Sequence, residues 1–155
     1  MVGCELMASF NAIFFIVTVS LAVQLVVLFL LLYGYVLYRR LNFRGHGMVM
    51  AWAVVLHLVI VFAIMVPSFV YALLPYYIFV NPLELTSIVS IFHEVMGAIA
   101  LGLGVWFVAT WRFRKDFRGC FNKRKLMLAT MIAWLAALTF GIALYSILSS
   151  GLLMA

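Results

Sequence analysis

Four long apolar runs divide the chain, at about residues 8–38, 46–70, 85–111 and 126–148. A helix that crosses the hydrocarbon core of a bilayer needs about 20 predominantly apolar residues. Each run meets that length, and the short connections make consecutive spans antiparallel neighbours. The pattern therefore predicts an all-α integral membrane protein, a four-helix antiparallel bundle that forms one domain over residues 1–155.

Positive charge is confined to the connection between the first two runs and the connection between the last two. The ten Lys and Arg residues are Arg39, Arg40 and Arg44, followed by Arg112, Arg114, Lys115, Arg118, Lys123, Arg124 and Lys125. Lys and Arg collect in short loops on the cytoplasmic side of a membrane. We therefore expect both basic connections inside and both termini outside, in the plasma membrane of a prokaryote.

The composition is that of a membrane protein. The 155 residues are 69% hydrophobic and 9% charged, with a mean hydropathy of +1.28, whereas a soluble domain is about half apolar and a quarter charged. The net charge of +6 lies beside apolar helices, so it indicates attraction to anionic lipid headgroups and not to nucleic acid. Four spans use nearly the whole length and leave no room for an extramembrane domain.

Cys4 and Cys120 fall on opposite sides of the membrane in this topology, so we expect no disulfide within the chain. Neither CxxC nor CxxCH occurs, which gives no support to thiol redox chemistry or to covalent c-type heme. The N-terminus lacks the basic start of a signal peptide, and the first apolar run is too long for one. We expect that run to be a retained span.

Pro67 is expected to kink or end the second span near residue 70, because proline removes a backbone donor. The outer connection, about residues 68–82, is apolar and aromatic although it faces water in this topology. Such a surface is typical of a segment that lies in the membrane interface or contacts a partner. We expect other membrane subunits to bind there.

Four polar or ionisable side chains lie inside the apolar runs: Gln24, His57, His93 and Glu94. Burying such groups in lipid costs free energy, so a functional role is the starting hypothesis for each of them. His57 precedes Pro67 by ten residues, and His93 follows the proline at position 82 by eleven. At 1.5 Å per residue, both lie about 15 Å below the outer helix ends. Two imidazoles at the same depth on neighbouring helices are typical of the axial ligands of a b-type heme. We therefore predict that His57 and His93 bind one b-type heme.

Small residues accompany the second of these histidines, since His93, Gly97, Ala100 and Gly104 recur at helical spacing. A stripe without bulk lets a flat macrocycle approach the helix, and these residues complete the predicted heme-binding set. It equally lets another helix approach, which is the ordinary use of small residues in membranes. A structural hydrogen-bonding role for both histidines, and proton or quinone handling, stay open as alternatives.

Three further polar residues receive separate expectations. His46 starts the second span at the basic connection, where a histidine is readily solvated, so we expect a surface role and at most one heme per chain. Glu94 points about 100° away from His93 around the helix and is the candidate proton carrier or quinone contact. Gln24 is expected to join neighbouring helices by a hydrogen bond.

Other chemistries lack their residues in this chain. The P-loop, HExxH and GxSxG motifs do not occur, which argues against the nucleotide, metalloprotease and serine-hydrolase sites that those motifs build. A small transporter would be expected to carry a pair of broken helices or a line of polar residues. The sequence shows neither.

Three segments share a pattern with a known family. They are His46-Gly-Met-Val-Met at a span start, Phe92-His93 early in the next span, and Lys125-Leu-Met-Leu with Trp134 and Gly141-Ile-Ala-Leu-Tyr145 in the last. Over roughly residues 45–148 the chain resembles short four-span membrane proteins linked to heme-copper oxidase assembly or to cytochrome b-like function. That family places a histidine before the last span, where this chain has Lys123, Arg124 and Lys125, so no ligand role is carried to that position. The resemblance implies a respiratory-chain setting.

The leading hypothesis is a small cytochrome b-like respiratory subunit that holds one b-type heme between His57 and His93. It would exchange electrons with a quinol pool or a larger partner, as the electron-transfer subunit of an oxidoreductase complex. The alternative is a heme-free structural or assembly subunit of an oxidase-type membrane complex. The apolar outer connection and the expected lack of an extramembrane domain favour that alternative.

Overall fold

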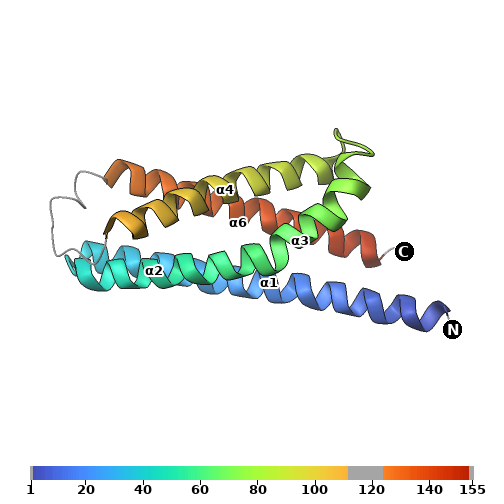
Figure 1. Ribbon diagram of the computed structural model, residues 1–155, viewed down its shortest axis with the longest axis horizontal. Helices are drawn as coiled ribbons and strands as arrows, with labels where there is room; N and C mark the ends of the chain where they lie inside the picture. Colours follow the sequence, from blue (N-terminus) through green and yellow to red (C-terminus); the bar gives the residue numbers. More distant parts are fainter. Residues whose placement is uncertain (1, 112–123, 154–155) are drawn as a thin grey trace.

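The computed structural model describes the backbone of residues 2–111 and 124–153, and this part of the chain forms four long helical segments (Figure 1). They are α1 (Val2–Arg39), α2 (Phe43–Ile60) continued by η1 (Val61–Met65), α3 (Val66–Ser68) and η2 (Phe69–Ile78), α4 (Leu85–Trp111) and α6 (Arg124–Leu153). Each segment contains a stretch long and apolar enough to cross a membrane: Phe15–Arg39, Phe43–Ile78, Leu85–Thr110 and Arg124–Ser150. The prediction of four helices that could span a membrane is confirmed.

The helices form two antiparallel hairpins, α1 with α2 and α4 with α6, which lie side by side (Figure 1). Both chain ends lie at one end of the bundle, and the α1–α2 turn lies at the other (Figure 1). Arg39 and Arg124, at the end of α1 and the start of α6, lie at the turn end and line one cavity. Cys120 and the predicted basic residues from Arg112 to Lys123 lie outside the described residues.

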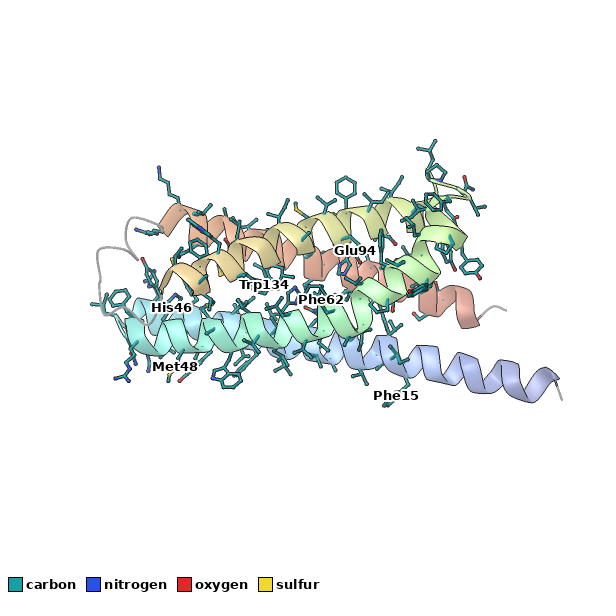
Figure 2. The ribbon with its side chains drawn as sticks, viewed as in Figure 1. Phe15, His46, Met48, Phe62, Glu94 and Trp134 are labelled. Atoms are coloured by element: carbon teal, nitrogen blue, oxygen red, sulfur yellow. The ribbon has the colours of Figure 1, made fainter. Side chains whose placement is uncertain are left out.

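The core is small and lies where the two hairpins meet. It consists of Val27 and Leu31 from α1, Ala53 and Val54 from α2, Ala100 from α4, and Ala133 and Trp134 from α6. Large apolar side chains are exposed instead, among them Phe15, Trp52 and Phe62. Figure 2 labels Phe15 and Phe62 among the side chains that it draws. That distribution suits a bilayer, because acyl chains solvate apolar side chains and association depends on close packing of small residues.

A short turn and a side-chain cap set the start of α2. Leu41 has a φ of 59°, a left-handed conformation that reverses the chain. The Asn42 side chain then accepts a hydrogen bond from the Gly45 backbone N–H at 3.1 Å and caps the helix. As a result α2 begins at Phe43, so His46 lies inside the helix rather than at its edge.

The second span differs from its prediction, because helical structure continues past Pro67 to Ile78. Two π-helical segments flank the short α3, and the Val66 N–H bonds to the Val61 carbonyl five residues back. A widened π turn accommodates a proline that cannot donate its own hydrogen bond. The segment bends near α3 and crosses toward α4 (Figure 1). The predicted loop over 68–82 is therefore wrong, and the outer connection is only residues 79–84.

Candidate functional site

His57 is buried in the middle of the bundle, with 4% of its surface exposed. Its Nδ1 lies 3.1 Å from Nε2 of Gln24, which is also buried and comes from α1. The Gln24 amide also lies 3.9 Å from the Met65 sulfur. The expectation that Gln24 joins helices is therefore confirmed, and its partner is one of the predicted ligands.

The other nitrogen of His57, Nε2, is buried and has no hydrogen-bond partner among the described residues. Trp134 of α6 lies against this ring, with the two ring centroids 5.1 Å apart at 62°. The buried Ser90 Oγ and Trp134 Nε1 are also unpaired within the described part of the chain. Buried polar atoms in native structures are almost always paired, so each such atom requires an explanation.

His93 is half-buried on α4 and is held by the other helix of its own hairpin. Its Nδ1 lies 2.8 Å from the Ala137 backbone oxygen on α6. A carbonyl oxygen only accepts, so Nδ1 carries the proton and donates. The ring packs directly over Gly141, where an added Cβ would lie 2.8 Å from its Cε1 atom.

The two histidines are not level along the bundle. His57 contacts Trp134, whereas His93 contacts Ala137 and Gly141, three and seven residues further along α6. At 1.5 Å per residue that offset is about 5–10 Å. The estimate of equal depth took Pro67 as the end of the second span, and that premise does not hold.

The stripe of small residues on α4 is used in two ways. Ala100 is completely buried in the core, and a Cβ at Gly104 would lie 3.1 Å from Val54 and 3.4 Å from Trp134. This half admits neighbouring side chains, as in ordinary helix packing. At Gly97 an added Cβ would meet nothing within 4 Å. Gly97 is thus the position of the stripe that leaves space beside His93.

His46 is buried, with 7% of its surface exposed, so the predicted surface role is wrong. Its Nδ1 donates to the Gly34 carbonyl of α1 at 2.8 Å, and its ring lies beside Tyr38. Two features of the turn cause this. The Asn42 cap starts the helix before His46, and the turn brings the imidazole against the Gly34 carbonyl of α1.

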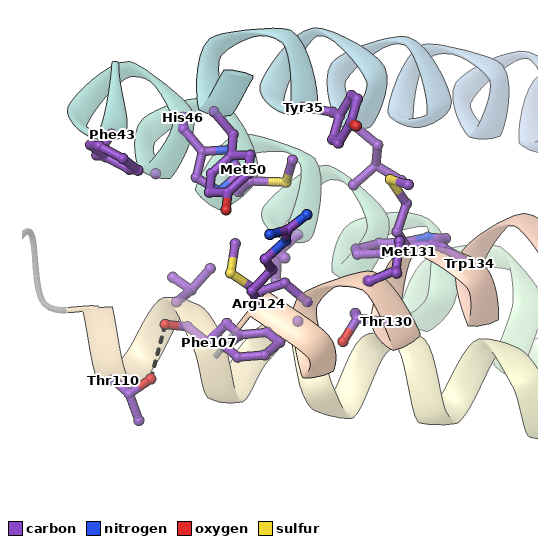
Figure 3. Close-up of a pocket in the computed structure, with 18 of the residues that line it drawn as sticks. Tyr35, Phe43, His46, Met50, Phe107, Thr110, Arg124, Thr130, Met131 and Trp134 are labelled. Atoms are coloured by element: carbon purple, nitrogen blue, oxygen red, sulfur yellow. Dashed lines mark hydrogen bonds between the residues drawn. The ribbon is translucent and has the colours of Figure 1, made fainter. Parts of the chain in front are cut away.

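A cavity of about 510 Å³ lies beside His46, between the two hairpins (Figure 3). All four helices contribute to it, and most of its walls are aliphatic, thioether or aromatic. Besides His46, its lining includes Tyr35 and Arg39 of α1, Met50 of α2, Phe107 of α4, and Arg124, Met131 and Trp134 of α6. Sequence patterns did not indicate this cavity, because its members are spread over four helices.

Glu94 is half-buried on α4 (Figure 2). Sequence reasoning did not indicate that Trp134, Ala137 and Gly141 contact the histidines. A glycine in an apolar span was a visible signal at Gly141, whereas Ala137 acts through its backbone oxygen and leaves no signal in the sequence.

The described residues contain no group of three or more His, Cys, Asp or Glu side chains that could hold a metal ion. A heme differs from such a site, since its iron takes only axial ligands from the protein. Imidazole side chains that could serve as such ligands come from His57 and His93, whose contacts fall on different turns of α6. Comparison of the chain with protein-family models, curated proteins and solved structures finds no match.

Proposed function

We propose that this chain is a small respiratory membrane subunit that binds one b-type heme, with His57 as the principal axial ligand and His93 as the second. The observation that supports this is the unpaired Nε2 of His57 in the bundle interior. Metal-binding histidines are oriented by a hydrogen bond to one ring nitrogen while the other binds the metal. Gln24 provides such a bond at Nδ1.

The tautomer of the His93 ring is consistent with this role. Nδ1 of His93 donates to the Ala137 carbonyl, so in the neutral ring Nε2 carries the lone pair that a metal requires. For His57 the structure places the Gln24 Nε2, which only donates, against Nδ1, so Nδ1 accepts and Nε2 carries the proton. Metal binding through Nε2 therefore requires the Gln24 amide to be reversed. If Gln24 Oε1 faces Nδ1, it accepts the Nδ1 proton, and the lone pair lies on the unpaired Nε2.

A bound heme would supply one-electron redox chemistry. The chain's own residues would position the imidazoles, and Gly97 would leave room for the edge of the macrocycle. Glu94 remains the proposed proton carrier or quinol contact. We also propose that the basic connections face the cytoplasm of a prokaryote and that other membrane subunits bind at the opposite end.

Reduced-minus-oxidised absorption spectra of the full chain, purified in detergent and loaded with hemin, test this proposal. We expect one heme per chain, loss of heme in His57→Ala, and a five-coordinate, high-spin spectrum in His93→Ala, because that variant keeps only one of the two ligands. The matched control is His46→Ala, the third histidine of the chain, which should retain the wild-type spectrum. Failure to bind hemin, or unchanged spectra in both ligand variants, would refute heme binding at this site.

The second candidate is a heme-free structural or assembly subunit of an oxidase-type complex. The hydrogen bond from His93 to Ala137 and the contact of His57 with Gln24 favour it, because they join helices without any cofactor. In that case the isolated protein is colourless and co-purifies with membrane partners. Both histidine variants would then lower stability without altering any absorption band.

A further inference from the structure

The cavity beside His46 differs from the histidine site in both position and charge. It lies at the end of the bundle that carries the α1–α2 turn, and none of the described residues that line it is Asp or Glu. Arg39 of α1 and Arg124 of α6 bring one guanidinium from each hairpin, and both side chains are exposed. The structure describes the surroundings of two acidic side chains, Glu84 and Glu94, and neither of them lines the cavity.

The rest of the cavity is a surface for an apolar chain. Leu31, Met50, Met131 and Trp134 line it toward the core. Unbranched methionine side chains adapt to ligands of irregular shape. The Arg124 side chain extends from α6 into the space between the hairpins (Figure 3). The cavity therefore has positive charge at the helix ends and an apolar surface deeper in the bundle. A membrane lipid has a matching arrangement, with a polar headgroup at one end and apolar acyl chains at the other.

We infer that this cavity binds one acidic phospholipid, with its phosphate between Arg39 and Arg124 and an acyl chain along the apolar wall. Basic pockets between membrane helices on the cytoplasmic side are sites for anionic headgroups. Guanidinium groups bind phosphate by paired, charge-assisted hydrogen bonds. The inference rests on the proposed orientation of the bundle, but it does not depend on heme.

The lipid would also join the two hairpins. The core between them is small, and the cavity separates α1 and α2 from α4 and α6 at this end. His46 and Tyr38 hold the α1–α2 wall in place, through the bond to Gly34 and the contact between their rings. A molecule that contacts both Arg39 and Arg124 would add contacts between the two hairpins at this end.

Native mass spectrometry of the purified full chain tests the inference, after exchange with phosphatidylglycerol or phosphatidylcholine of equal acyl length. We expect one retained phosphatidylglycerol per chain and at least about tenfold weaker retention of phosphatidylcholine. Arg39→Gln with Arg124→Gln should abolish that preference. The matched control is Arg40→Gln with Lys125→Gln, which removes two adjacent positive charges outside the lining and should retain the preference.

A second pair of variants tests the apolar part without changing charge. Met131→Trp fills the cavity and should release the lipid, whereas Ile132→Trp on the exposed face should not. Circular dichroism confirms that each variant is folded, and hemin loading, measured separately, shows whether the proposed function stands. Equal retention of both lipids, an equal loss in the control pair, or displacement of the lipid by millimolar inorganic phosphate would overturn the inference.

Discussion

Gly141→Ala tests whether the contact of His93 with α6 holds the second hairpin together. An added Cβ would lie 2.8 Å from Cε1 and 3.1 Å from Nδ1 of His93. Real Cβ atoms essentially never approach another atom closer than 3.0 Å, so the imidazole must move. Because Nδ1 donates to the Ala137 oxygen at 2.8 Å, that movement weakens or breaks the hydrogen bond between α4 and α6.

The size of the effect follows from two costs and one gain. A hydrogen bond between membrane helices is worth about 0.6–1.7 kcal/mol, and overpacking costs about 1–3 kcal/mol. Replacing a helical glycine by alanine gains about 1 kcal/mol in the opposite direction. We therefore expect Gly141→Ala to lower the free energy of unfolding by about 1–3 kcal/mol.

The matched control is Gly102→Ala on α4, where an added Cβ meets nothing within 4 Å. It should leave the free energy of unfolding unchanged or raise it by up to about 1 kcal/mol. Both variants can be unfolded in mixed micelles with increasing sodium dodecyl sulfate and followed by circular dichroism. Equal stability of Gly141→Ala and Gly102→Ala would show that the His93 contact is not formed in the protein.

Three other outcomes are expected. Gln24→Leu leaves Nδ1 of His57 unpaired and should lower the free energy of unfolding by about 0.6–1.7 kcal/mol in the same assay; an unchanged value contradicts the contact. Ser90→Ala removes an unpaired Oγ, so stability should stay within about 1 kcal/mol of wild type or rise; a larger loss indicates a partner. In intact cells, an impermeant maleimide should label Cys4 but not Cys120, and the reverse pattern would invert the topology.

The four helices were predictable because a span in lipid must satisfy all its backbone hydrogen bonds within itself. That requirement fixes the length of an apolar run regardless of which apolar residues it contains. The predicted end of the second span near Pro67 was wrong, because π-helical turns continue the segment to Ile78. Sequence rules treat proline as the end of a helix, whereas the choice between a stop and a widened turn depends on how the backbone hydrogen bonds rearrange.

The candidate site was predictable in its residue types but not in its geometry. Gln24, His57 and His93 are in the interior, as their cost in lipid requires. Their partners were not predictable, because a backbone carbonyl such as that of Ala137 leaves no mark in the sequence. Helix periodicity gives the face of a residue, but the sliding of one helix along another decides its depth. The offset between His57 and His93 arises from that freedom.

The three histidines differ in the hydrogen bonds that their ring nitrogens make, and His57 differs from the other two. His46 and His93 each donate from Nδ1 to a backbone carbonyl on the adjacent helix of their own hairpin. The missing side chain of Gly141 leaves room for the His93 ring, whereas a Cβ at Gly34 would meet Met50. Helix packing alone accounts for those two bonds. His57 is more deeply buried than His46, relies on a side chain from α1, and keeps an unpaired nitrogen. Packing does not explain that nitrogen, so a ligand is best sought at His57 first.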